Sequence, residues 1–176
     1  MIRGGTTSVG LAAATIAKSH DITVASTSRR KERQPILRQA GADYVFIDTG
    51  AIANDVRNAL RGGADKVLEL VGTTTLRDSL LCVREPGLVC MTGIVGDKWS
   101  LEHFSPMEAI PTAVGLTTYD GGPKDFMAMP FQDLIDQIVA GKMQVHVGRT
   151  FRLDEIVDAH RLMESNAAGG KIVVLT

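Results

Sequence analysis

The stretch GGTTSVG at residues 4–10 has the composition of a loop that binds phosphate groups. It runs into the small and apolar segment VGLAAATIA at residues 9–17, which has the length and composition of a helix. In a loop between a strand and a helix, glycines permit a tight turn, and free amides point at a phosphate at the positive end of the helix. The candidate phosphate-binding residues are Gly5, Thr6, Thr7, Ser8, Val9 and Gly10.

The spacing of this loop departs from the G-x-G-x-x-G pattern of dinucleotide-binding loops. Gly5 and Gly10 stand at the first and last positions of the pattern, and Thr7 stands at the middle one. The hydroxyls of Thr6, Thr7 and Ser8 could replace the lost backbone approach with side-chain hydrogen bonds to phosphate. The alternative is a small-residue turn that packs a helix against a strand without binding a ligand.

A basic segment, STSRRKER, follows the expected second strand at residues 26–33. A fold that binds NAD usually presents a carboxylate here to the adenosine ribose, but no acidic residue appears before Glu32. Hydroxyl and guanidinium groups such as those of Ser28, Arg29 and Arg33 suit the extra 2′-phosphate of NADP. The alternative is a solvated, basic start of a helix, although basic charge there is unfavourable with the helix dipole.

Glycines also end the expected fourth and fifth strands. The fourth strand ends at Val71 and Gly72, and the fifth ends at Thr92, Gly93 and Ile94. Glycine at these points would leave room for a flat ring and expose backbone groups to a carboxamide, because ligands of doubly wound sheets lie beyond the carboxyl ends of the strands. Local backbone structure alone could also require these glycines.

The elements that must position these residues alternate between strand and helix. The expected strands lie at residues 22–27, 43–48, 65–72 and 88–96, and the expected helices lie at residues 9–17, 51–62 and 74–83, with another that ends near Gly41; the segment 85–87 is expected to be a turn. This alternation predicts the α/β class: a doubly wound parallel sheet (Rossmann fold) in a three-layer α/β/α arrangement.

After residue 97 the regular alternation ends. Two prolines interrupt residues 97–111, and AVGLTTY at residues 113–119 has the composition of a strand. A helix from about Phe131 to Gly141, a strand at residues 146–151, a helix at residues 153–165 and a strand at residues 171–176 complete the chain. Because there is no repeat, low-complexity tract or linker, we predict a single domain over residues 1–176.

Composition places the chain among globular proteins. Apolar residues make up 44% and charged residues 22%, and 19 basic and 20 acidic side chains leave a formal charge of −1. This balance provides no overall field to attract nucleic acid or an anionic membrane. No apolar run reaches the ~18 residues of a membrane span. Cys82 and Cys90 are expected to be reduced thiols, and the expected location is the cytoplasm.

The chain resembles the medium-chain dehydrogenase/reductase superfamily, in its zinc-free quinone oxidoreductase branch. The resemblance covers nearly the whole chain, and IRGGTTSVGLAAATIAK resembles the glycine loop and first helix of that family. Further segments carry it: AGADYVFID, DKVLELVG, LVCMTGIVG and the closing FRLDEIVDAHRLMESNAAGGKIVVLT. The resemblance implies that this chain is the nucleotide-binding domain alone, because the family also has an N-terminal catalytic domain.

The resemblance also implies a cofactor and its contacts. NADP is the expected cofactor, with NAD possible, and Arg33 aligns with a basic position that contacts the 2′-phosphate in related enzymes. The pyrophosphate would meet residues 5–10, and the nicotinamide would lie near Val71, Gly72, Thr92, Gly93 and Ile94. Asp48 stands where some NADP-binding relatives have tyrosine, and a carboxylate near the phosphate would repel it.

By resemblance, the intact protein would transfer hydride from NADPH to a quinone or conjugated carbonyl, its small-molecule substrate. No catalytic residue is expected on this chain, since the groups that face the substrate would lie in the missing domain. A non-catalytic nucleotide-binding or interaction module is the alternative. A methyltransferase is less consistent, because it would place an acidic residue where the arginines stand.

Two further expectations concern metals and assembly. The four histidines and two cysteines show no zinc-site spacing, so no metal site is expected. In the superfamily, the strand that corresponds to Val114–Tyr119 lies at the edge of the sheet and pairs with its twofold mate. Since pairing removes an exposed sheet edge, we predict a homodimer through these residues.

Overall fold

The computed structural model describes residues 1–165 and 167–176, and its main feature is a six-stranded sheet with the strand order β3-β2-β1-β4-β5-β6. Every neighbouring pair in this sheet is parallel. The strands are β1 (Ile2–Arg3), β2 (Ala25–Ser28), β3 (Tyr44–Ile47), β4 (Ala64–Glu69), β5 (Val83–Met91) and β6 (Val114–Thr118). This order is that of a doubly wound Rossmann sheet, so the predicted fold class is confirmed.

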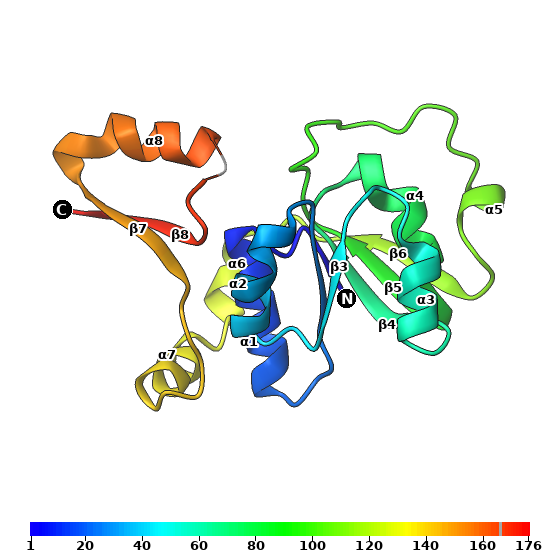
Figure 1. Ribbon diagram of the computed structural model, residues 1–176, viewed down its shortest axis with the longest axis horizontal. Coiled ribbons are helices and arrows are strands. Elements are labelled where there is room, and N and C mark those ends of the chain that lie inside the picture. The colour runs from blue at the N-terminus through cyan, green and yellow to red at the C-terminus, as the bar shows by residue number, and fades with distance from the viewer. Residues whose placement is uncertain (166) are drawn as a thin grey trace.

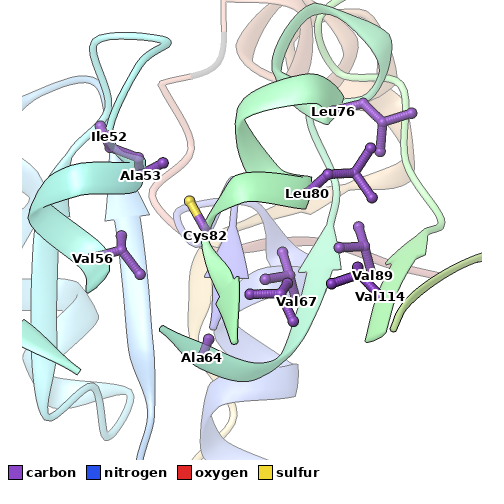
Figure 2. Packing of buried hydrophobic residues seen from close by; sticks show 11 residues of the cluster. Ile52, Ala53, Val56, Ala64, Val67, Leu76, Leu80, Cys82, Val89 and Val114 are labelled. Carbon is purple, nitrogen blue, oxygen red and sulfur yellow. The ribbon is translucent and has the colours of Figure 1, made fainter. Parts of the chain in front are cut away.

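Helices cover both faces of the sheet (Figure 1). The covering helices include α1 (Ser8–Ser19), α2 (Gln34–Gln39), α3 (Ala53–Ala59) and α4 (Thr73–Leu81), with a 3₁₀ turn at Lys31–Arg33 before α2. On one face, Leu11 of α1 and Leu37 of α2 pack in a cluster with Ile2. On the other face, α3 and α4 enclose a second cluster, which Figure 2 shows around Val67 and Val89.

Several strands differ from their predicted extents: β4 ends at Glu69 rather than at residue 72, and β5 covers Val83–Met91 rather than residues 88–96. The second strand was expected at residues 22–27 but begins at Ala25. The backbone amide of Val24 donates to the carboxylate of Asp43 at 2.8 Å, so this amide is satisfied without a neighbouring strand. The turn expected at residues 85–87 falls inside β5, at an irregularity of that strand: Glu85–Pro86 is a cis peptide, and Ala64 of β4 pairs with Val83 whereas Lys66 pairs with Leu88.

The C-terminal segment forms a second, smaller sheet. Strands β7 (Val147–Arg152) and β8 (Lys171–Leu175) pair in parallel, and α8 (Ile156–Glu164) connects them after a 3₁₀ turn at Leu153–Glu155. Figure 1 shows these elements beside the six-stranded sheet. The remaining helices are α5 (Pro106–Ala109), α6 (Pro123–Ala128) and α7 (Phe131–Val139). The single domain over residues 1–176 stays a prediction.

Among the described residues, no helix has both the length and the apolar character needed to cross a membrane.

Candidate functional site

A cleft of about 880 Å³ opens at the carboxyl ends of the first four strands, and the loop before β8 forms its other wall. Its volume lies within the usual range for small-molecule and cofactor sites. Eight of the predicted site residues line it: Thr6, Thr7, Ser8, Val9, Ser28, Arg29, Arg33 and Val71. Three separate loops of the sheet therefore meet at one cleft, as expected for a doubly wound fold.

The glycine loop holds α1 at one end of this cleft. The hydroxyl of Thr7 accepts from the amide of Gly10 at 2.9 Å, and it donates to the carbonyl oxygen of Gly4 at 2.9 Å. Thr7 is thus the N-cap of α1, and its hydroxyl is engaged by the loop itself. Ser8 and Val9 are exposed in the first turn of the helix, where backbone amides have no partner within the helix.

Gly5 and Gly10 lie behind the cleft rather than on its wall. A Cβ atom on Gly5 would come within 1.9 Å of Ser26 Oγ, and one on Gly10 would come within 2.7 Å of the Gly4 carbonyl oxygen. These glycines are required for close packing of the helix, the loop and β2. The packing alternative for the two glycines is therefore supported, and the expected phosphate contacts fall to the exposed residues between them.

The basic segment after β2 forms the second part of the cleft. Arg29 and Arg30 are exposed, and Ser28 is buried. The Ser28 hydroxyl accepts from the Arg30 amide at 3.1 Å and donates to the Arg30 carbonyl oxygen at 2.9 Å, which fixes the turn. Arg33 lines the same region. Several guanidinium groups thus surround one end of the cleft, a distribution suited to an anionic ligand.

A buried ionic network, which sequence analysis missed, lies beneath this part of the cleft. Arg3 is fully buried. Its Nε and Nη2 donate to both carboxylate oxygens of Asp48, at 2.9 and 2.7 Å. Its Nη1 donates to Asp78 Oδ2 at 2.6 Å and to Ser79 Oγ at 3.2 Å. The network joins β1, the end of β3 and α4 under the cleft floor.

The network stabilises the charged forms of Arg3 and Asp48. Burial acts to lower the pKa of Arg3, but the hydrogen bonds and charges of Asp48 and Asp78 outweigh it and raise that pKa. Burial acts to raise the pKa of Asp48, but the hydrogen bond and charge of Arg3 prevail and hold it below 3.8. The pair is therefore ionic at neutral pH. The single basic residue in the short first strand was the available signal for it.

Glu69 organises the loop after β4 and was also missed. Its side chain is fully buried, and its Oε1 accepts from the amides of Val71 and Gly72 at 2.7 and 3.0 Å. Its Oε2 accepts from the hydroxyls of Thr75 and Ser79. These four donors satisfy a buried carboxylate, which would otherwise be costly. The one acidic residue within the apolar run VLELV was a signal that could have identified it.

The expected nicotinamide region is only partly exposed to the cleft. Val71 lines it, whereas Gly72, Thr92, Gly93 and Ile94 do not. A Cβ atom on Gly72 would lie 2.9 Å from the carbonyl oxygen of Gly93, and one on Gly93 would lie 2.5 Å from that of Leu70. Close approach of the two loops therefore explains both glycines. The predicted contacts of these residues with a cofactor stay predictions.

The second wall of the cleft comes from the C-terminal segment. Met163 and residues 168–172 line it, and the Ser8 hydroxyl donates to the carbonyl oxygen of Gly170 at 3.4 Å. Other lining residues beyond the predicted set are Gly4, Thr27, Arg30, Asp48, Thr49, Gly50, Thr74, Thr75, Val95 and Gly96. The segment 168–172 is distant in sequence from the glycine loop, so sequence spacing could not indicate that they meet.

The donor set does not fit a metal ion. Within residues 1–165 and 167–176, no group of three or more histidine, cysteine, aspartate or glutamate side chains could hold one. The two cysteines are free thiols. Burial is the main cause that raises the pKa of Cys82 to about 12, which disfavours the thiolate that metals bind.

Comparison with known proteins gives a consistent family. A family model described as zinc-binding dehydrogenase matches residues 40–174. A quinone oxidoreductase of Lama guanicoe is 27% identical over 181 residues, an alignment that covers 99% of this chain and 53% of that protein. The chain thus spans about half the length of the curated relatives it matches.

Solved structures agree in fold. A mycobacterial protein in complex with NADPH superposes with a TM-score of 0.83 at 24% identity, covering 99% of this chain and 55% of that one. The quinone oxidoreductase of Escherichia coli complexed with NADPH gives a TM-score of 0.83 at 18% identity, covering 99% of this chain and 56% of that one. At these identities the likeness shows the fold.

Proposed function

Because this chain belongs to the zinc-binding dehydrogenase family, we propose that it is the NADP(H)-binding part of an oxidoreductase that transfers hydride to a quinone or conjugated carbonyl. The proposal rests on one observation: the first turn of α1 and the residues Ser28, Arg29 and Arg33 line different parts of the same cleft. The names of the relatives support the reaction class, since they are quinone oxidoreductases.

In this proposal the pyrophosphate lies at the start of α1. The exposed first turn at Ser8 and Val9 offers backbone amides and the positive end of the helix dipole. The 2′-phosphate lies near Arg29 and Arg33, where guanidinium groups form charge-assisted hydrogen bonds with phosphate oxygens. Val71, which the side chain of Glu69 holds in position, borders the nicotinamide end.

A bound NADPH supplies the hydride, so the residues of this chain bind and orient rather than react. Proton donation and substrate contacts are assigned to the part of the relatives that this chain does not span. No step is assigned to zinc, because the described residues contain no suitable ligand cluster. The alternative function, a nucleotide-binding or interaction module without turnover, differs only in that no substrate reacts.

The proposal includes a homodimer through β6. This strand occupies an edge of the six-stranded sheet, so one row of its backbone groups has no neighbouring strand in the sheet. A twofold-related copy that pairs with it would extend the sheet. Sedimentation at micromolar concentration should give the mass of a dimer, and a monomer there would contradict this part. The cytoplasmic location stays a prediction.

The test of the proposed function is a Ser8→Asp variant. An added carboxylate at the start of α1 favours the helix through its dipole but repels a pyrophosphate at the same point. Calorimetric titration should therefore show that the Kd for NADPH rises by about tenfold or more while the protein stays folded. Ser8→Ala is the matched control and should change the Kd by less than about threefold.

Three further ligands and one assay separate the alternatives. The wild-type chain is titrated with NADPH, NADH and S-adenosylmethionine; binding of the last alone would favour a methyltransferase. Quinone reduction by this chain alone should be absent or slight, and substantial turnover would contradict the assignment of substrate contacts to another domain. If neither NADPH nor NADH binds, the proposed function is wrong.

A further inference from the structure

Asp48 occupies a position in the cleft from which it can influence the choice of dinucleotide. It follows β3 and lines the cleft together with Ser28 and Arg29. Its backbone amide donates to the carbonyl oxygen of Ser28 at 2.8 Å, so it lies directly beside the basic turn. A free carboxylate here would repel a 2′-phosphate and could accept hydrogen bonds from the ribose hydroxyls of NAD.

The carboxylate of Asp48 has no acceptor capacity left for a ligand. An ionised carboxylate offers about four acceptor sites on its two oxygens. Oδ1 accepts from Arg3 Nη2 at 2.7 Å and from the Gly50 amide at 2.9 Å. Oδ2 accepts from Arg3 Nε at 2.9 Å and from the Thr27 hydroxyl at 3.3 Å. Ribose hydroxyls would have to displace one of these donors.

The charge of Asp48 is also compensated from below. Arg3 is fully buried and approaches from the first strand with a bidentate pair, and the Asp48 side chain is only 6% exposed. Arg3 is held in this orientation by Asp78 and Ser79 at its other nitrogen. The cation therefore cannot turn away to water, and the pairing is a permanent feature of the cleft floor.

We propose that Arg3 is a positioning residue that sets dinucleotide preference: by engaging Asp48, it weakens the repulsion of a 2′-phosphate and occupies the acceptor for an NAD ribose, and so favours NADPH over NADH. Arg3 acts through Asp48 and does not touch the dinucleotide. This inference rests on the proposed function. It adds that Arg3, by pairing with Asp48, makes the floor of the cleft compatible with the 2′-phosphate of NADPH.

The test compares Arg3→Gln with Arg3→Gln/Asp48→Asn. The single variant releases the Asp48 carboxylate, so the ratio of the NADH to the NADPH dissociation constant should fall by about tenfold. The double variant has no carboxylate to release and should return this ratio to within about threefold of wild type. The fragments adenosine 2′,5′-bisphosphate and 5′-AMP, which differ only in the 2′-phosphate, should show the same pattern.

Lys18→Gln is the matched control. Lys18 pairs with Asp43 at 2.6 Å, and Asp43 directly precedes β3, at the opposite end of that strand from Asp48. The control also separates an aspartate of the sheet from its cationic partner, but this pair lies away from the cleft. It should leave the ratio within about twofold of wild type. Circular dichroism checks the folding of each variant.

Arg3→Gln leaves two carboxylates unpaired and could unfold the chain. In that case Arg3→Gln/Asp78→Asn is measured instead, because it removes one of the two and still releases Asp48. A ratio within twofold of wild type in the folded variant overturns the inference, as does a wild-type chain that binds NADH more tightly than NADPH. If the wild-type chain binds neither, the proposed function itself is wrong.

Discussion

Residues 1–118 and residues 123–176 of this chain differ in the extent to which they bury apolar side chains in a core. The first region, which contains the six-stranded sheet, encloses one cluster on each face. In the second, among the residues that the structure describes, the buried apolar side chains are those of Met143, Phe151 and Ala159. Exposed apolar side chains there include Met127 at 81% and Val139 at 82%.

This difference shows that a local pattern can form an element without providing it with a core. Helix α7 has apolar residues at helical spacing, and it was predicted correctly from them. Its apolar face nevertheless stays largely in contact with water in the described chain. A two-stranded sheet such as β7–β8 is at best marginally stable by itself. The first region should therefore carry most of the stability of the chain.

The two regions should differ most in how much free energy of unfolding is lost when an ion pair is broken. Asp78 accepts from Arg3 and also from the amides of Ile52 and Ala53 at 3.0 and 3.1 Å. Asp78→Ala should lower the free energy of unfolding by about 3–5 kcal/mol, because it leaves a buried cation with one partner fewer. Asp158→Ala breaks the exposed pair with Arg161 and should cost less than about 1 kcal/mol. Urea denaturation measures both, and equal losses would contradict the comparison.

A second contrast concerns leucines. Leu80 is fully buried between α4 and the sheet, and Leu80→Ala should lower the free energy of unfolding by about 2–5 kcal/mol through lost contacts and a cavity. Leu153, at the start of the turn before α8, is 58% exposed, and Leu153→Ala should change this free energy by less than about 1 kcal/mol. The comparison would fail if Leu153→Ala were the more destabilising change in thermal or urea unfolding.

The smallest change in stability is expected when the pH is lowered from 7 to 5, because the Arg3–Asp48 pair stays ionised over this range. The pKa of Asp48 in the folded chain lies below 3.8, its unperturbed value, so the pair contributes full stability above that value. This contribution is lost as the pH falls through the depressed pKa. The urea midpoint should be nearly constant from about pH 7 to 5 and fall below about pH 3.8. In Asp48→Asn the acid-induced fall should be shallower; an identical fall would show that other groups cause it.

The parts of the fold and site that could be predicted were those indicated by residues close together in the sequence. Strand–helix alternation indicated the doubly wound sheet, and Gly41 correctly marked the end of the helix that is α2. The glycine loop and the basic turn after β2 were also found from composition. The turn expected at residues 85–87 lies inside β5, at the point where the register with β4 shifts, so its place was found but the extent of the strand around it was not.

The role of the loop residues needed the structure. Thr7 was expected to offer its hydroxyl to phosphate, yet that hydroxyl caps α1. Gly72 and Gly93 were expected beside a ring; the structure shows that they also allow two loops to approach each other, and their contact with a ring stays a prediction. Asp48 was expected to repel a phosphate, and it is paired with Arg3. Each difference arises from a contact with a group that sequence position does not indicate.

The parallel sheet, its helices and the position of the first glycine loop could be read from the sequence alone, because hydrophobic period, glycine placement and helix composition act over a few residues. The contacts of Arg3 with one aspartate 45 positions away and with another 75 positions away became visible in the folded chain. The tertiary structure also decided which apolar faces remain exposed. Pairing of buried charges and burial of apolar faces both depend on what packing brings together across the chain, and no local pattern specifies those partners.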